Sequence, residues 1–275
     1  MSKKIVLSPL GGLANRMRSI MSALALAEKC GMTLEVFWIR DKGLNCCFSD
    51  LFCVDNLPFK VVELGRMNGF KYNVPRKRNL YITKFFQNTR FEQCLYENDV
   101  LLLKDSPEQL IDKVRGKHTF IASGISFYPS DDIDPKSLFV PTDELQSMIN
   151  ARSYMFKGRY VVGVHIRRTD NLVSISESPL ECFIAKMNEW NKTNRDVCFY
   201  LATDDLTVKA TISDMFLDKV CTSGSEVSRS TENGMKEAVV EMFTLANTDY
   251  FIGSYYSSFS DLILLMNGNG EIIHK

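Results

Sequence analysis

The chain has 275 residues, which suits one large α/β domain or two domains of about 130 residues each. Its hydrophobic content of 45% is enough for a full core, and its 33 basic and 33 acidic residues leave no formal net charge. This balance argues against a general polyanion-binding surface, and therefore against a nucleic-acid partner, because basic clusters such as 75–78 are local.

The amino terminus and the cysteines favour a soluble protein of the cytoplasm. Residues 1–4 lead into an apolar run that is too short for a signal peptide or a membrane span. The eight cysteines lack the paired CxxC spacing of a metal site, and several lie in apolar segments. We therefore expect reduced thiols in the core.

The first elements are a strand at 4–7, a turn containing Gly11 and Gly12, and a helix that runs through Ala27. Paired glycines let a backbone approach a ligand closely, and the start of the helix presents free N–H groups to an anion. The turn matches neither the GxGxxG pattern nor the P-loop, so it predicts neither dinucleotide nor ATP binding. A purely structural tight turn is the alternative.

The rest of the first half alternates less cleanly. Strands are predicted at 33–38, 99–103 and 118–121, and a short helix at 46–52. The stretch 60–91 is aromatic and basic with weak periodicity. It is predicted to be a surface loop, with the lining of an acceptor groove as the alternative.

A turn-rich interval at 128–135 and a helix at 142–155 precede the predicted domain boundary. The aspartates of this interval have no second ligand cluster near them, so a solvated loop is favoured over a metal site. We place one domain at 1–153 and the other at 154–275.

From residue 160 onward strands and helices alternate regularly, which predicts a mostly parallel sheet. Two Rossmann-like halves facing one cleft are the architecture that the whole pattern suggests. The strands are expected at 160–165, 197–201, 218–221, 250–252 and 271–274, and the helices at 179–190, 206–216, 234–246 and 257–266.

A histidine, two arginines and an aspartate follow the apolar strand in the run His165-Ile166-Arg167-Arg168-Thr169-Asp170. Polar residues at the carboxyl end of such a strand line the ligand crevice of an open α/β sheet. The run therefore predicts an anion site.

Four motifs occur in an order that resembles the GDP-fucose-dependent fucosyltransferases, the superfamily of the α1,6-fucosyltransferases and the protein O-fucosyltransferases. They are the glycine turn Gly11–Asn15, the HxRRxD run at His165–Asp170, Leu201–Asp205 and Ser257–Ser260. The resemblance implies an α/β GT-B fold, inverting transfer of fucose from GDP-fucose to a glycan acceptor, and no metal or other cofactor.

The resemblance also implies roles for the residues of the run. Arg167 would clamp the β-phosphate of GDP through two parallel hydrogen bonds, with a surface salt bridge to Asp170 as the alternative. Arg168 points the other way along the strand and would either contact the nucleotide or brace the loop. His165 would contact guanine or serve as a satisfied core histidine.

Other residues would complete the nucleotide site. Glu241 matches an acidic residue of the family that accepts two guanine N–H groups, although a lone glutamate on a helix is usually solvated. Asp204 and Asp205 would contact the nucleotide or cap the loop. The start of the last helix, at Ser257, Ser258 and Phe259, would hold the pyrophosphate or be simply capped. The glycine turn, with Gly11, Gly12 and Asn15, would approach the phosphates or the reacting centre from the other domain.

The catalytic base is where the chain departs from the α1,6 enzymes, which carry a lysine just after the motif's aspartate. Here Asn171 follows Asp170, and the next acid is Glu177. An inverting transfer needs a group that takes the proton of the acceptor hydroxyl. Glu177 is the first candidate for this group and Asp170 the second.

The sequence thus favours a GDP-fucose-dependent glycosyltransferase acting on a cell-envelope or capsular glycan precursor, a glycan or glycolipid. A different GDP-sugar donor is one alternative, and a non-catalytic nucleotide- or glycan-binding protein is another. No transmembrane segment is expected, which leaves peripheral membrane contact open.

Overall fold

The computed structural model describes residues 3–169, 171–194, 196–224 and 230–275. The chain forms two compact units. The first holds the chain up to Val140 with a short later segment that ends at Glu232, and the second holds the rest. The second unit thus includes the helix α7 (Asp143–Tyr154), which the sequence grouped with the first domain.

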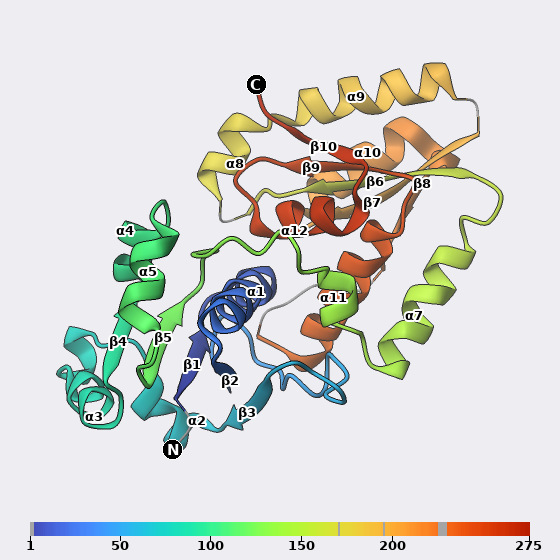
Figure 1. Ribbon diagram of the computed structural model, residues 1–275. Helices are drawn as coiled ribbons and strands as arrows, with labels where there is room; N and C mark the ends of the chain where they lie inside the picture. Colours follow the sequence, from blue (N-terminus) through green and yellow to red (C-terminus); the bar gives the residue numbers. More distant parts are fainter. Residues whose placement is uncertain (1–2, 170, 195, 225–229) are drawn as a thin grey trace. The chain divides into compact units, whose positions relative to one another are not determined.

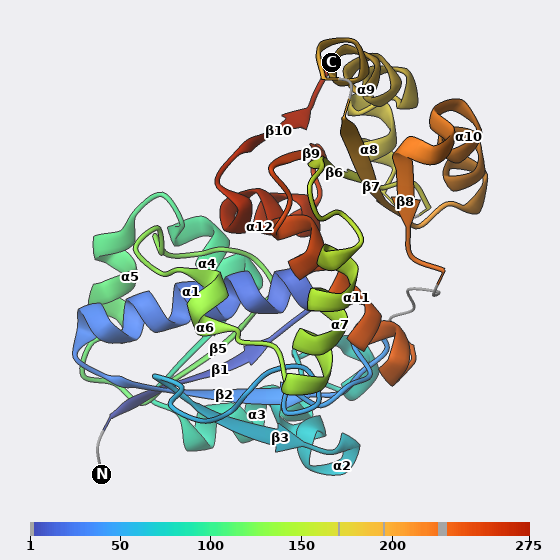
Figure 2. The same ribbon diagram turned by 90° about the vertical axis from the view of Figure 1, so that its right-hand side faces the viewer.

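The first unit is built around a five-stranded parallel sheet in the order β3-β2-β1-β5-β4 (Figure 1). Helix α1 (Leu13–Cys30) lies along one face of this sheet (Figure 2). Because β1 is central and is buried from Ile5 onward, its apolar run is continuous rather than alternating. The strands are β1 (Lys4–Pro9), β2 (Thr33–Ile39), β3 (Lys60–Leu64), β4 (Gln93–Tyr96) and β5 (Thr119–Ser123).

The second unit repeats this plan with the parallel order β10-β9-β6-β7-β8. Its core packs strand residues such as Val164 and Phe199 against Phe183 and Ile212 of the covering helices α9 and α10. The strands are β6 (Tyr160–Ile166), β7 (Val197–Thr203), β8 (Val220–Thr222), β9 (Tyr250–Ser254) and β10 (Gly270–Ile273). The helices are α8 (Leu172–Glu177), α9 (Leu180–Thr193), α10 (Leu206–Phe216), α11 (Glu232–Ala246) and α12 (Ser258–Asn267).

The strand orders define where each sheet reverses its direction of winding. In the second unit β6 pairs with β7 on one side and with β9 on the other, so the reversal lies between β6 and β9. In the first unit β1 pairs with β2 and β5, so the reversal lies between β1 and β5. Open α/β sheets bind ligands at the carboxyl ends of the strands beside such a reversal.

Three sequence predictions for the first half are wrong. The stretch 99–103 belongs to a helix, α4 (Glu97–Leu103), because the Asp99 carboxylate accepts the Tyr96 backbone N–H at 2.8 Å and caps the helix. The stretch 46–52 forms turns instead of a helix, with the Cys46 carbonyl accepting the indole N–H of Trp38 at 2.9 Å.

The stretch 60–91 is not a loop. It holds β3, the short helix α2 (Arg66–Gly69), the 3₁₀ turns η1 (Phe70–Tyr72) and η2 (Lys77–Asn79), and helix α3 (Ile82–Arg90). The sequence also left β4, α5 (Pro107–Val114) and the short α6 (Pro135–Leu138) without a prediction. It placed a loop where α8 lies, and it began the strand 218–221 within the 3₁₀ turn η3 (Leu217–Lys219).

Candidate functional site

The carboxyl ends of β6 and β9 are joined by two buried serines. Ser254, the last residue of β9, accepts the Arg167 N–H at 2.9 Å and donates to the His165 carbonyl at 3.2 Å through its hydroxyl. Ser260 of α12 accepts the Ser254 N–H at 3.0 Å. These bonds fix the backbone that leaves β6 beside the start of α12, at the reversal of the sheet.

His165 is buried at this junction, 7% exposed. Its Nδ1 lies 2.7 Å from the Ser260 hydroxyl, and its ring centroid lies 4.9 Å from that of Phe259. Burial, with a smaller contribution from the Arg167 charge, lowers the pKa of His165 to about 4. The imidazole is therefore neutral at pH 7.

Arg167 pairs with Asp204, the residue after β7. Its Nη1 lies 2.7 Å from Asp204 Oδ2, and both side chains are about one-fifth exposed. Burial alone would raise the pKa of Asp204, but the Arg167 guanidinium and three donors from Arg168 and Thr169 hold that pKa below its usual value. Asp204 thus caps the loop after β6 and positions Arg167. Asp170 lies outside the described residues.

The side chain of Arg168 has different partners from that of Arg167. It is 8% exposed and donates to the carbonyls of Arg167 at 3.0 Å and Ser178 at 2.9 Å. Its guanidinium lies 5.8 Å from the centre of the Phe183 ring. These contacts brace the loop between β6 and α9, which is the second of the two roles considered from the sequence.

Two of the remaining predicted residues cap helices. Asp205 accepts the N–H groups of Thr207 and Val208 and begins α10. Ser257 accepts the Ser260 N–H and begins α12, so that Ser258 and Phe259 occupy the first turn. The amide groups of that first turn point out of the helix start, which leaves an anion-binding arrangement beside the end of β9.

Glu241 lies on α11 among a group of polar residues that the sequence did not connect. Glu237, one turn earlier, pairs with Arg152 at 2.7 Å and accepts the Ser223 hydroxyl. Tyr200 lies 3.3 Å from Arg152. Among the described residues, Glu241 has no hydrogen bond or ion pair, although it is only 8% exposed.

This isolation changes the chemistry of Glu241. Burial, together with the nearby Glu237 charge, raises the pKa of Glu241 to about 8. The side chain is therefore largely protonated at pH 7 and would ionise beside a ligand that donates hydrogen bonds to it.

A glycine brings α11 close to β6. A Cβ atom at Gly163 would lie 2.7 Å from the Thr248 hydroxyl and 3.1 Å from Leu245. No larger residue fits there unless the end of α11 shifts, so Gly163 fixes the helix that carries Glu241.

Glu177, the first candidate base, is tied to the carboxyl-terminal segment. Its carboxylate lies 3.6 Å from Nε2 of His274, and its carbonyl accepts the Lys275 N–H at 2.9 Å. The His274 ring in turn packs 4.1 Å from Tyr255. These contacts make Glu177 part of a local structural cluster.

In the first unit, Gly11 adopts a left-handed φ of 80°, and a Cβ atom there would lie 2.9 Å from Asn15 Nδ2. Gly12 caps α1 without a side-chain hydrogen bond. The buried Arg16, for which the sequence suggested no role, holds this turn by donating to the carbonyls of Gly11 at 3.0 Å and Ile39 at 2.7 Å. The turn is therefore preformed.

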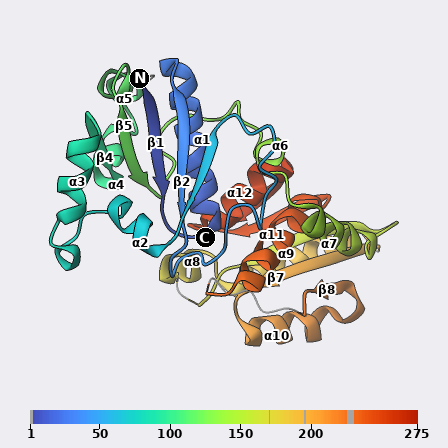
Figure 3. The same cartoon turned by 90° about the horizontal axis from the view of Figure 1, so that it is seen from below.

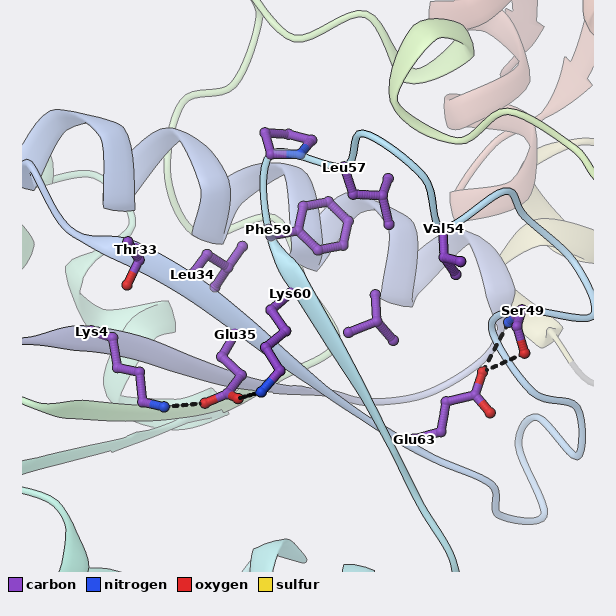
Figure 4. Close-up of a pocket in the computed structure, with 12 residues that line it drawn as sticks. Lys4, Thr33, Leu34, Glu35, Ser49, Val54, Leu57, Phe59, Lys60 and Glu63 are labelled. Carbon is purple, nitrogen blue, oxygen red and sulfur yellow. Dashed lines mark hydrogen bonds and ion pairs between the residues drawn. The ribbon is translucent and has the colours of Figure 1, made fainter. Parts of the chain in front are cut away.

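A separate cavity of about 820 Å³ lies against β2 and β3 of the first unit (Figure 4). One wall carries Glu35 between Lys4 and Lys60, and Glu63 accepts two hydrogen bonds from Ser49 at the other end. Glu35 is thus paired with both lysines, whereas the Glu63 carboxylate is held by a neutral serine. Lys4, Glu35 and Lys60 lie at the beginnings of their strands or next to them, away from the glycine turn that follows β1.

Several solved structures have a fold similar to that of this chain. NodZ α1,6-fucosyltransferase, in a crystal soaked with GDP-fucose, matches with a TM-score of 0.69 and 18% identity over 96% of this chain and 92% of that one. NodZ from Bradyrhizobium matches with a TM-score of 0.65, 19% identity, and 97% and 94% coverage. FUT1 of Arabidopsis thaliana, in complex with GDP, matches with a TM-score of 0.64 and 16% identity over 99% of this chain and 70% of that one.

The apo form of POFUT1 gives a TM-score of 0.63 at 10% identity, covering 99% of this chain and 98% of that one. No protein-family model matches the chain, and no curated protein matches by sequence. The predicted fold, two α/β units with parallel sheets as in GT-B fucosyltransferases, is confirmed.

Within residues 3–169, 171–194, 196–224 and 230–275, no three His, Cys, Asp or Glu side chains gather as metal ligands. In the same part of the chain, every helix is too short or too polar to cross a bilayer.

Proposed function

We propose that the protein is a glycosyltransferase that transfers fucose from GDP-fucose to a glycan acceptor with inversion at the anomeric carbon. The pairing of Arg167 with Asp204 beside the sheet reversal carries this proposal. It holds a guanidinium where open α/β sheets bind ligands. The four solved structures named above, all of fucosyltransferases, support it through their common fold.

In the proposed complex, Arg167 binds the β-phosphate through its fork of N–H donors. The amide groups at the start of α12, near Ser258 and Phe259, bind the diphosphate from the other side of the reversal. As the bond from fucose to the β-phosphate breaks, negative charge grows on the leaving oxygen and these groups stabilise it. Charge neutralisation is thus assigned to Arg167 and α12 rather than to a metal ion.

Guanine recognition is assigned to Glu241. A carboxylate accepts both the N1–H and the exocyclic amine of guanine, and no other group of the described residues occupies its oxygens. Neutral His165, held by Ser260, would pack near the base or phosphate.

The proton of the acceptor hydroxyl needs a base. Glu177 and Asp170 remain the two candidates. We assign the acceptor to the class of cell-envelope or capsular glycan precursors and the reaction to the cytoplasm.

The test is release of GDP from GDP-fucose in the presence of a panel of glycan acceptors. Arg167→Ala should abolish turnover, and Arg167→Lys should retain the charge but lose most of the activity because lysine cannot form the paired hydrogen bonds. Arg115→Ala, at an exposed arginine of the first unit, is the matched control and should be fully active. Unchanged turnover in Arg167→Ala would refute the assignment.

Two other outcomes would redirect the proposal. Turnover of a different GDP-sugar in place of GDP-fucose would keep the nucleotide site and change the donor. GDP binding without turnover on any acceptor would identify a non-catalytic nucleotide-binding protein.

A further inference from the structure

The segment between Glu63 and Glu92 has a charge unlike that of the rest of the chain. It contains seven basic residues and no acidic one. The rest of the protein contains the other 26 basic residues and all 33 acidic residues, so it is acidic. A local surface of one sign on an otherwise acidic protein selects an oppositely charged partner. The basic residues of the segment are Arg66, Lys71, Arg76, Lys77, Arg78, Lys84 and Arg90.

The same segment exposes large apolar side chains. Leu80 is 78% exposed and Phe85 75%, and Tyr81 and Ile82 are each at least half exposed. With the exposed Lys77 and Lys84, these four form what we call the α3 surface. Isolated exposed apolar residues are ordinary, but several large ones grouped on one part of the surface are a candidate interaction site.

Helix α3 is inverted relative to an ordinary surface helix. Its buried positions are polar, Thr83 and Gln87. The Gln87 amide donates to the carbonyls of Lys71 and Asn73 at 3.0 Å each and accepts the Tyr96 hydroxyl at 2.8 Å. A helix normally buries its apolar stripe and exposes its polar one. Here the polar side fastens the helix and leaves Ile82 and Phe85 in solvent.

The turn that leads into α3 is preformed. Asn79 accepts the Arg76 N–H at 2.9 Å and donates to the Val74 carbonyl at 3.0 Å. Leu80 and Tyr81 both adopt left-handed φ angles, of 48° and 55°. Helix α3 itself lies at the outer edge of the first unit, on the side of the edge strand β4 (Figures 1 and 3). The apolar residues are thus displayed on a fixed support.

We propose that the α3 surface docks on an anionic lipid bilayer. Apolar side chains flanked by Lys77 and Lys84 match the boundary between headgroups and acyl chains, with the two cations at the phosphates. A protein partner is disfavoured because lysine is depleted from the cores of protein interfaces. Docking would hold the first unit at a membrane, and it does not depend on which sugar nucleotide the second unit binds.

Co-sedimentation with vesicles tests the proposal. The full chain should bind vesicles of phosphatidylcholine with phosphatidylglycerol, should bind pure phosphatidylcholine much less, and should be released at high salt. Lys77→Glu with Lys84→Glu should weaken binding by at least about 25-fold, since each surface cation contributes roughly a factor of five. Ile82→Ser with Phe85→Ser should also release the protein from anionic vesicles.

The control is Leu102→Ser. Leu102 is 84% exposed on α4, but its neighbours in sequence include Asp99 and Asp105, so it should not face an anionic bilayer. Circular dichroism should show all variants folded, because every changed side chain is exposed. Absence of binding to anionic vesicles at low salt would overturn the proposal. An equal loss of vesicle binding in Leu102→Ser would also overturn it. The same holds if sedimentation velocity shows a dimer that the variant Ile82→Ser with Phe85→Ser dissociates while its vesicle binding stays unchanged.

Discussion

Arg167 and Asp204 are joined by a 2.7 Å ion pair that connects the ends of the neighbouring strands β6 and β7. Asp204 also accepts the backbone N–H groups of Arg168 and Thr169, at 2.8 and 3.3 Å. The carboxylate therefore fixes both the guanidinium and the loop behind it. Both residues belong to the second unit, so the guanidinium of the candidate anion site is positioned by the protein's own contacts.

Asp204→Asn should weaken GDP binding by tenfold or more, because Arg167 loses the partner that positions it. Its cost in unfolding free energy should be about 1–3 kcal/mol, because one charged acceptor of backbone N–H groups is weakened. Isothermal titration with GDP and thermal unfolding measure the two effects. Asp205→Asn is the matched control, since asparagine also caps helices and should leave both values nearly unchanged.

Arg167 and Arg168 should separate into a ligand-binding and a structural residue. Arg168→Ala leaves the Ser178 carbonyl without its donor and should lower the unfolding free energy by about 1–3 kcal/mol. Arg167→Ala removes a partly exposed side chain and should change stability far less while abolishing GDP binding. If Arg168→Ala left stability unchanged, the bracing role would be wrong.

The pKa of Glu241, raised to about 8, predicts a pH-dependent stability. The unfolded carboxyl releases its proton near pH 4.5, whereas the folded one keeps it until about pH 8. Stability from this group is therefore complete at low pH and is lost as pH rises to about 8. Glu241→Gln should abolish this loss, so the unfolding free energy of the variant should rise relative to that of the wild type between pH 5 and 8. Parallel denaturation curves would contradict the shift.

His165 predicts the opposite dependence on the acid side. Its pKa is about 4 in the folded protein, while the unfolded ring is protonated below about pH 6.5. The wild type should therefore lose up to about 3 kcal/mol relative to His165→Gln as pH falls from 6.5 to 4. Urea unfolding at several pH values measures the difference. A constant difference across this range would show that the imidazole is not kept neutral.

The sequence predicted the second unit well because its parallel strands are continuous apolar runs between clear helices. It failed at 99–103, where Leu101 and Leu102 form an apolar run that resembles a strand but is exposed on a helix. Local pattern cannot show which apolar residues will be buried. Helix α3 was missed for the same reason, because its buried residues are polar and its apolar ones are exposed.

The residues of the candidate site that follow β6 were predictable because the motif is contiguous. The group around Glu241 was not, since Arg152 lies 85 residues from its partner Glu237 and 48 from Tyr200. The one available signal was a pair of glutamates four residues apart in the apolar helix 234–246. Ser254, which joins the strand ends together with Ser260 of the last motif, carried no sequence signal of its own.

The most direct test of the central claim is a calorimetric titration of the wild type and Arg167→Ala with GDP and with UDP at low and neutral pH. We expect saturable GDP binding to the wild type, at least tenfold weaker UDP binding, and no measurable GDP binding to the folded Arg167→Ala variant. Tighter binding of UDP than of GDP, or unchanged GDP binding in the variant, would contradict it.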